Sequence, residues 1–195
     1  MFPSLQVCVI VSVCLTCLLP QCVHCSGCKN PPPAKNFTNS RYYGLWYEIG
    51  KIQTAGGAFF EKDCVCTTID VKPLSNSDVR GDASVLNSCR KKTPQGTFLN
   101  ATGKLSDESP AGKWKEGFAW FAPKVDYTII ALDEDYAVEY DCGTTLGFTN
   151  YCIHILSRKP TQSPEVTQKL LTFAESLGLN TENLKYVQTL QTGCW

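Results

Sequence analysis

Histidine is scarce in this chain of 195 residues: there are two, and one of them, His24, lies in an amino-terminal segment that we expect to be removed. Zinc and similar metals are usually held by histidine and cysteine residues at short spacings. Cys64 and Cys66 stand two positions apart, but no matching second pair follows them. The sequence therefore predicts no metal site.

An excess of positive charge is also absent. The chain has 18 basic and 18 acidic residues, and its longest basic run is Arg90-Lys91-Lys92. Proteins that bind nucleic acids carry clustered positive charge on one face. The composition therefore excludes a nucleic-acid partner.

Long apolar runs are missing as well. The longest, Val7 to Leu19, is shorter than the roughly 20 residues that span a bilayer, so we expect no stable membrane insertion. An apolar run of this kind at the amino terminus, followed by small residues, is typical of a signal peptide. We expect cleavage after Cys25, which leaves 26–195 as one mature domain. A buried amino-terminal strand or helix is the other interpretation.

Seven of the 12 cysteines follow Cys25: Cys28, Cys64, Cys66, Cys89, Cys142, Cys152 and Cys194. In an oxidising compartment such a set predicts disulfides and one thiol left over. Two N-glycosylation sequons, at Asn36 and Asn100, agree with secretion. The sequence thus predicts a secreted, extracellular glycoprotein with disulfide bonds.

The mature chain reads as a series of short strands. After the Pro-rich lead 30–33, runs rich in β-branched and aromatic residues alternate with turn sequences, which is typical of an all-β barrel or sandwich. The expected strands are 45–53, 64–73, 83–91, 97–105, 113–121, 126–132, 136–142 and 151–159. In the fifth, Trp114, Glu116, Phe118 and Trp120 share one face.

One helix follows the strands. Thr161 or Ser163 suits its N-cap, Pro164 its first turn, and Gly178 its end. Its apolar stripe, formed by Val166, Leu170, Phe173 and Leu177, predicts docking on the outside of the sheet.

Several motifs then resemble one family in order and spacing. Gly44-Leu45-Trp46 resembles the first lipocalin signature, and further matches are 27–32, 85–87, 118–123 and 155–158. The chain looks most similar to the apolipoprotein D and insect bilin-binding group of lipocalins. The second signature departs from the pattern, because only Asp133 survives from it. The resemblance implies an eight-stranded antiparallel up-and-down barrel with one carboxy-terminal α-helix packed outside.

The resemblance also implies roles for individual residues. Gly44 and Trp46 would form the closed floor of the barrel, with Arg158 stacked on the tryptophan. It implies two disulfides, Cys28–Cys142 and Cys64–Cys194. A third, Cys66–Cys89, is our own inference: if the second and third strands pair as a hairpin, these two residues fall opposite each other. Cys152 would then be the free thiol.

The resemblance further implies transport of a small hydrophobic ligand, with no obligatory cofactor. Candidate cargoes are a lipid or fatty acid, a steroid, a retinoid, or a linear tetrapyrrole such as a biliverdin-like pigment. Phe59 and Phe60 are expected in the entrance loop. The residues expected to line the pocket are Glu48, Phe98, Phe118, Trp120, Tyr127 and Tyr140.

Two other functions stay open at this point. The first is a thiol-dependent lipocalin-type isomerase, in which Cys66 or Cys152 would act; His154 lies two residues from Cys152 on the same strand face. A reactive thiolate needs a neighbour that lowers its pKa, and the sequence indicates none. The second is an interaction or inhibitor module that uses the barrel loops. A receptor or lipoprotein surface is a further candidate partner, and the oligomeric state is not readable.

Overall fold

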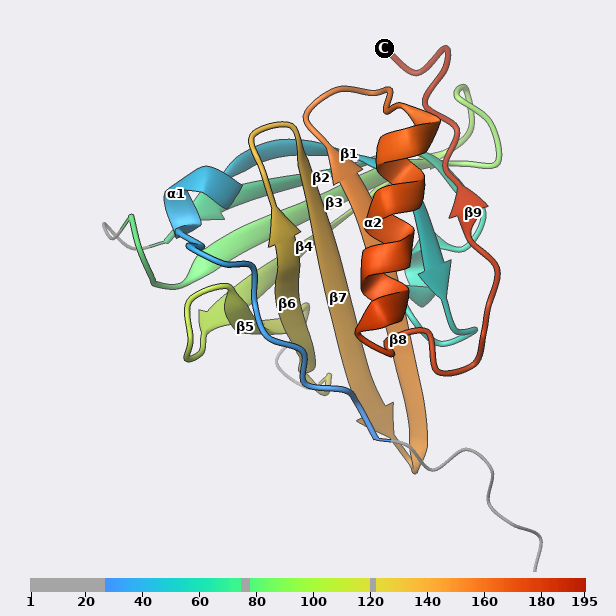
Figure 1. Ribbon diagram of the computed structural model, residues 1–195. Helices are drawn as coiled ribbons and strands as arrows, with labels where there is room; N and C mark the ends of the chain where they lie inside the picture. The colour runs from blue at the N-terminus through green and yellow to red at the C-terminus, as the bar shows by residue number, and fades with distance from the viewer. Residues whose placement is uncertain (1–26, 75–77, 120–121) are drawn as a thin grey trace, which may run out of the picture.

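A computed structural model describes residues 27–74, 78–119 and 122–195; the expected signal peptide, 1–25, lies outside them. Its elements form an antiparallel barrel with one long helix beside it (Figure 1). The strands are β1 (Gly44–Gln53), β2 (Cys64–Pro73), β3 (Ala83–Lys91), β4 (Phe98–Asp107), β5 (Lys113–Gly117), β6 (Val125–Leu132), β7 (Tyr136–Thr145), β8 (Phe148–Ser157) and β9 (Val187–Gln188). The helices are α1 (Asn39–Tyr42), the 3₁₀ turn η1 (Phe59–Glu61) and α2 (Pro164–Ser176).

The eight longer strands close into a ring. Each of β2 to β8 pairs with its neighbours in sequence, and β1 pairs with both β8 and β2. The expected eight-stranded lipocalin-like barrel with an outer helix is confirmed. The fifth strand is shorter than expected, because it ends at Gly117.

Alternation along the strands divides the apolar residues into two groups. One group fills the interior at the end of the barrel next to α1 and includes Trp46, Ile69, Val85, Leu105 and Trp114. The other lies on the outer face of β1, β7 and β8 and is covered by Leu170, Leu171 and Ala174 of α2. Period-two alternation therefore gives the sheet an inner core and an outer one.

The helix α2 begins and ends as the sequence predicts. Ser163 is the N-cap, and its hydroxyl accepts a hydrogen bond from the Val166 amide; Pro164 is the first helical residue. Gly178 follows the helix with a φ of +66°, a conformation that glycine adopts without strain. One residue of the expected stripe is misplaced: Phe173 is 40% exposed, and Leu171 is buried instead. None of the described helices is long and apolar enough to cross a membrane.

The floor of the barrel is aromatic and held by one arginine. The Arg158 guanidinium carbon lies 3.5 Å from the centre of the Trp46 ring, as the resemblance implies. The same guanidinium donates hydrogen bonds to the carbonyls of Leu45, Arg41 and Tyr43. Arg158 thus joins the end of β8 to the turn before β1 and closes the floor.

The carboxy-terminal tail completes the wall where the ring is weakest. The β1–β2 pairing covers only Gly44 to Tyr47 of β1. Beyond it, β9 pairs with Gly50 and Lys51, and the Cys66 amide donates to the Leu190 carbonyl. The tail therefore fills the gap between the diverging ends of β1 and β2.

The disulfides correct part of the expected pairing. Cys28 is bonded to Cys142, the pair that the resemblance implies. Cys64 is bonded to Cys89 and Cys66 to Cys194, so the expected Cys64–Cys194 and Cys66–Cys89 pairs are wrong.

A β-bulge causes this exchange. The β2–β3 register is shifted between Val65 and Thr68, and Cys66 inside the bulge has a φ of +54°. An inserted residue turns the side chains that follow it to the other face of the sheet. Cys66 therefore faces the tail, while Cys64 meets Cys89 across the hairpin.

Loss of the floor arginine should weaken the fold. We expect Arg158→Ala to lower the free energy of unfolding by about 2–4 kcal/mol, since a stacked cation and three charge-assisted hydrogen bonds disappear. Arg90 lies 5.4 Å from the ring of Phe98, which is 52% exposed, so Arg90→Ala serves as a control with an expected loss of about 0–1 kcal/mol. Urea unfolding measures both, and equal losses would contradict the role of Arg158.

Candidate functional site

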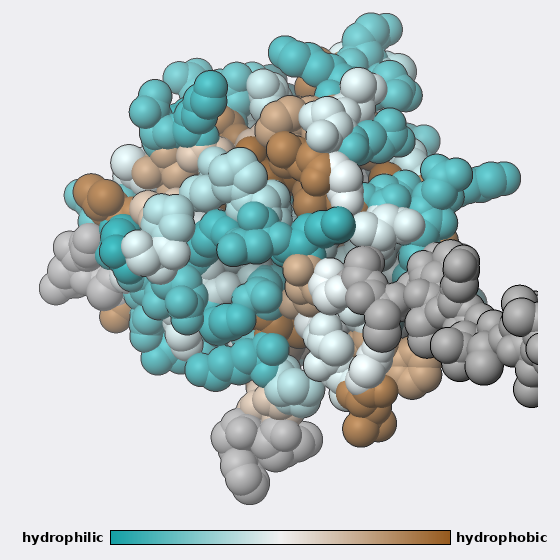
Figure 2. Space-filling model, turned by 60° about the horizontal axis from the view of Figure 1, so that its bottom comes forward, coloured by the Kyte–Doolittle hydropathy of each residue, from teal (hydrophilic) through white to brown (hydrophobic). Residues whose placement is uncertain are grey.

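A cavity of about 490 Å³ occupies the barrel at the end opposite the floor. Its mouth is apolar, with Phe60, Phe118, Ala122, Pro123 and Val125 among the lining residues. Figure 2 turns this end forward and shows separate hydrophobic patches on a mostly hydrophilic surface. Leu146 and Phe148, at the β7–β8 turn, are 93% and 73% exposed.

The base of the cavity is polar, in contrast to its mouth. Glu116 comes from β5, Asp141 from β7, and Cys152 and His154 from β8. Alternation brings them inside, because Glu116 shares a face with Trp114, Asp141 with Glu139, and His154 with the buried Leu156. Ionisable side chains thus form a layer between the apolar mouth and the aromatic floor.

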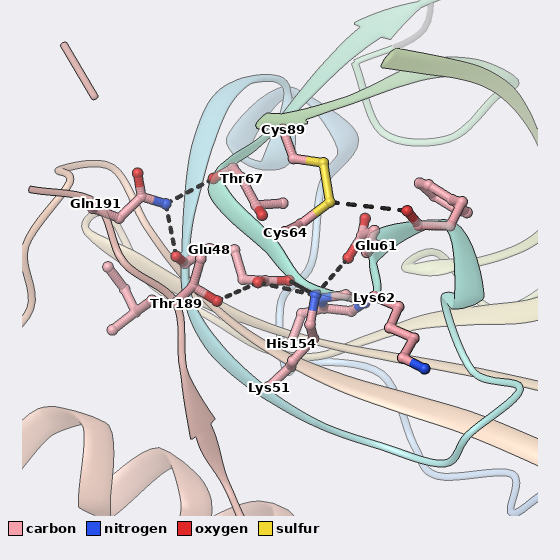
Figure 3. A network of polar contacts seen from close by, with 12 residues as sticks. Glu48, Lys51, Glu61, Lys62, Cys64, Thr67, Cys89, His154, Thr189 and Gln191 are labelled. Atoms are coloured by element: carbon pink, nitrogen blue, oxygen red, sulfur yellow. Dashed lines mark hydrogen bonds and ion pairs between the residues drawn. A yellow bond between two sulfur atoms is a disulfide. The ribbon is translucent and has the colours of Figure 1, made fainter. Parts of the chain in front are cut away.

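One side of this layer is a buried ion-pair group. The Lys51 ammonium lies 3.2 Å from a Glu48 carboxylate oxygen and 2.9 Å from one of Glu61. The register of β1 shifts between Glu48 and Gly50, and this bulge brings Lys51 back to the face that Glu48 occupies. Figure 3 shows the three side chains converging with His154.

The tail contributes to the same group. The Thr189 hydroxyl donates to the Glu48 carboxylate, and the Gln191 amide donates to the carbonyls of Glu48 and Thr67 (Figure 3). Burial opposes ionisation of Glu48, but Lys51 and the hydrogen bond from His154 outweigh it and lower the pKa of Glu48 to about 2. Glu48 is therefore an anion that its neighbours fully pair.

His154 connects the two sides of the layer. Its Nδ1 lies 2.7 Å from a Glu48 oxygen, while its Nε2 lies 3.6 Å from Asp141 Oδ2 and 3.9 Å from Glu139 Oε1. Because a carboxylate only accepts, Nδ1 carries the donated proton. Burial alone would lower the pKa of His154, but Cys152, Glu48 and Glu139 around it raise that pKa well above its ordinary value.

The other side of the layer holds carboxyl groups with few partners. Burial, together with the charge of Glu139, raises the pKa of both Glu116 and Asp141 well above the usual range. Glu116 Oε1 and Asp141 Oδ1 are buried and have no hydrogen-bond partner. Glu139 differs, because its Oε2 accepts hydrogen bonds from the hydroxyls of Tyr42 and Tyr127.

Only some of the expected pocket and entrance residues line the cavity. Phe118 and Phe60 line the cavity, and Glu48 lies inside the barrel, in the ion-pair group. Tyr127 is also inside but belongs to the floor. The side chain of Phe59, and all of Trp120, lie outside what the structure describes.

Two expected pocket residues point outward, and those predictions are wrong. Tyr140 packs in the outer core beside Tyr151, and Phe98 is on the outer face with 52% of its surface exposed. Glu139 and Asp141 take the inner positions of β7, while Leu99 and Ala101 take those of β4. Both errors are shifts of one residue, and such a shift moves a side chain to the opposite face.

Of the ionisable residues of the base, Glu116 was placed on the aromatic face of the fifth strand and His154 was singled out beside Cys152, but Glu139 and Asp141 were not predicted. Sequence alternation in 137–145 and 151–157 places Glu139 and Asp141 on one face, and Cys152 and His154 on one face. Which face points inward was not evident, because the more apolar face of both strands is the outer one, which α2 and the residues around it cover. The floor residues could have revealed the inner face. Trp46 and Leu156 lie inside the barrel, and every second residue counted back from Leu156 along β8 points the same way.

Three comparisons with known proteins agree with this geometry. A family model described as a lipocalin-like domain matches residues 38–189. The chain is 32% identical to apolipoprotein D of Bos taurus over 180 residues, covering 89% of this chain and 87% of that protein. It is 28% identical to the outer membrane lipoprotein Blc of Escherichia coli K12 over 169 residues, covering 83% and 88%. Lobster apocrustacyanin A1 shares the fold, with a TM-score of 0.59 and 17% identity over 78% of this chain and 79% of the other.

The unpaired carboxyl at the base should make stability depend on pH. A carboxyl whose folded-state pKa is raised binds protons more tightly when folded, so it destabilises the fold as pH rises above its unfolded pKa of about 4.3. We expect Glu116→Gln to stabilise the protein by roughly 1–3 kcal/mol at pH 8 and to have little effect at pH 4. Urea unfolding at both pH values measures this, with Glu108→Gln as an exposed control. A variant less stable than the wild type at pH 8 would contradict the assignment.

Proposed function

Because the chain belongs to the lipocalin family, we propose that it binds a small hydrophobic molecule in its barrel and transports it outside the cell. The observation that carries this proposal is the cavity of about 490 Å³, which the aromatic floor closes at one end and which is apolar at its mouth. Cavities of roughly 300–1,000 Å³ with apolar walls and a few polar groups are typical of small-molecule sites.

The charge at the base bears on the cargo. The apolar part of a ligand fits beside Phe60, Phe118 and Val125, and its far end reaches the carboxyl groups of Glu116 and Asp141. A ligand carboxylate brought beside these groups would lose its hydration in a place with little water, and no described lysine or arginine pairs with Glu116 or Asp141 there. Among the candidates, neutral steroids and retinoid alcohols therefore suit the cavity better than fatty acids or linear tetrapyrroles, which carry carboxylates.

The proposal includes secretion. Three disulfides link six of the described cysteines, and disulfides persist in oxidising compartments. Asn36 and Asn100, the two sequon asparagines, are exposed and so accessible to glycosylation. We propose a signal peptide over 1–25 and a mature lipocalin domain over 26–195.

Filling the cavity should abolish binding. Ala101 lines the cavity on the inner face of β4, so we expect Ala101→Trp to raise the Kd for the neutral dye Nile red at least 10-fold. Phe98→Ala, on the outer face of the same strand, is the matched control and should leave the Kd unchanged. The measurement is a fluorescence titration of folded protein. Equal Kd values for the wild type and Ala101→Trp would exclude the cavity as the binding site.

The isomerase alternative depends on a reactive thiol, and the structure offers a poor one. Cys152 is the one free cysteine in the described part of the chain, and it is buried. Burial raises the pKa of its thiol, although His154 and Lys51 oppose this shift. Cys66, the other candidate, is in a disulfide.

The thiol can be tested directly. We expect Cys152 to be inert to Ellman's reagent in the folded protein at pH 8 and to react once the protein is unfolded in urea, because only the exposed thiol ionises readily. Fast reaction of the folded protein, lost in Cys152→Ser, would favour the isomerase over the carrier.

A further inference from the structure

We propose that the base of the cavity binds a divalent first-row transition-metal ion such as Zn²⁺. Its ligands would be His154 Nε2 together with the carboxylates of Asp141 and Glu139. This site goes beyond the proposed transport function and does not depend on it. It also departs from the sequence expectation, since the three residues form no short metal-binding motif.

The ligand atoms lie at distances suited to a shared ion. Nε2 is 3.6 Å from Asp141 Oδ2 and 3.9 Å from Glu139 Oε1, too far for a direct hydrogen bond. One ligand atom from each residue lies within 4.8 Å of the other two. Zinc binds such atoms at about 2.0–2.2 Å, which separates neighbouring ligands of a tetrahedral ion by roughly 3.3–3.6 Å, so the longer of the two distances needs only a small closure around the ion.

Two of the three proposed ligands, His154 and Glu139, are oriented by hydrogen bonds to residues outside the ligand set. His154 donates its Nδ1 proton to Glu48, 2.7 Å away, so its Nε2 faces the carboxylates and would bind an ion on release of the second ring proton. Glu139 receives the hydroxyls of Tyr42 and Tyr127 on Oε2, at 2.9 and 2.6 Å, and this leaves Oε1 on the side of His154. Metal-binding histidines and carboxylates are typically held by such outer hydrogen bonds.

Two buried carboxyl oxygens beside this cluster have no hydrogen-bond partner in the protein. Glu116, 5% exposed, lines the cavity, and its buried Oε1 has no partner; Asp141 Oδ1 is likewise buried and unpartnered. Buried polar atoms almost always have partners, so two orphaned carboxyl oxygens in one cavity point to a bound group.

The opposite side of His154 shows how the fold treats a similar cluster. Glu48, Glu61 and His154 also bring ligand atoms together, but there the Lys51 ammonium occupies the space between the carboxylates. Among the described ion pairs, no lysine or arginine reaches Glu116, Glu139 or Asp141. The structure thus supplies its own cation on one side and leaves the other to an ion from solution.

The test uses the full mature protein, freed of metal by a chelator. We expect Zn²⁺ to bind with 1:1 stoichiometry by isothermal titration calorimetry, and Co²⁺ to give visible absorption bands of a protein-bound ion. Asp141→Asn should weaken Zn²⁺ binding at least 10-fold. Glu61→Gln, in the same cavity on the side of Lys51, should change the affinity less than 3-fold. Cys152→Ser should bind as the wild type does, since the thiol is not among the ligands.

Several outcomes would overturn the proposal. No 1:1 binding of either metal to the wild type excludes the site, whatever the variants do. Equal weakening by Asp141→Asn and Glu61→Gln shows diffuse attraction to an acidic cavity. Binding of dodecylamine that depends on Asp141, without metal binding, assigns the site to an organic cation. The Kd for Nile red, measured on the same proteins, tests the transport proposal separately, because this neutral dye is expected to bind at the apolar mouth.

Discussion

Closure of the sheet is the constraint on which the rest of this structure depends. Once β1 pairs with both β8 and β2, each strand has one inner and one outer face, and every second side chain must fit inside a ring of eight strands. The closure is narrow, because only four residues of β1 pair with β2. The floor around Trp46 and Arg158 closes the ring at one end, and the tail bound through Cys66–Cys194 closes the gap above it.

Most of the fold followed from sequence because its signals are local. Turn residues delimited the strands, Ser163, Pro164 and Gly178 delimited α2, and the lipocalin motifs identified the floor. The exchange of Cys64 and Cys66 could not be foreseen in this way. It depends on one inserted residue in β2, and a bulge leaves no clear mark in a run such as Cys-Val-Cys-Thr-Thr.

The candidate site was less predictable than the fold because it depends on which face of each strand in the ring points into the barrel. Phe98 and Tyr140 are apolar enough for an interior, but period-two patterning does not say whether the more apolar face of a strand points into the barrel or toward a helix outside it. The outer face of β7 and β8 is apolar because α2 covers it, so an aromatic there is as well buried as one inside. Carboxylates such as Glu139 and Asp141 were overlooked because sequence reasoning assigns charge to solvent.

Burying the ionisable layer costs free energy, and this cost indicates that part of the layer has a role other than stabilising the fold. Replacing buried charged groups by apolar ones of similar size is often neutral or stabilising, so a fold that needed only a closed floor would have no use for Glu116 and Asp141. The side with Lys51 is internally neutralised and joined to the tail through Thr189, and it contributes to closing the wall. On the side facing the cavity, Glu139 accepts hydrogen bonds from the floor residues Tyr42 and Tyr127, but Glu116 Oε1 and Asp141 Oδ1 have no hydrogen-bond partner. These two carboxyl groups lie where the far end of a ligand or a bound cation would be, and binding there would offset the cost of burying them.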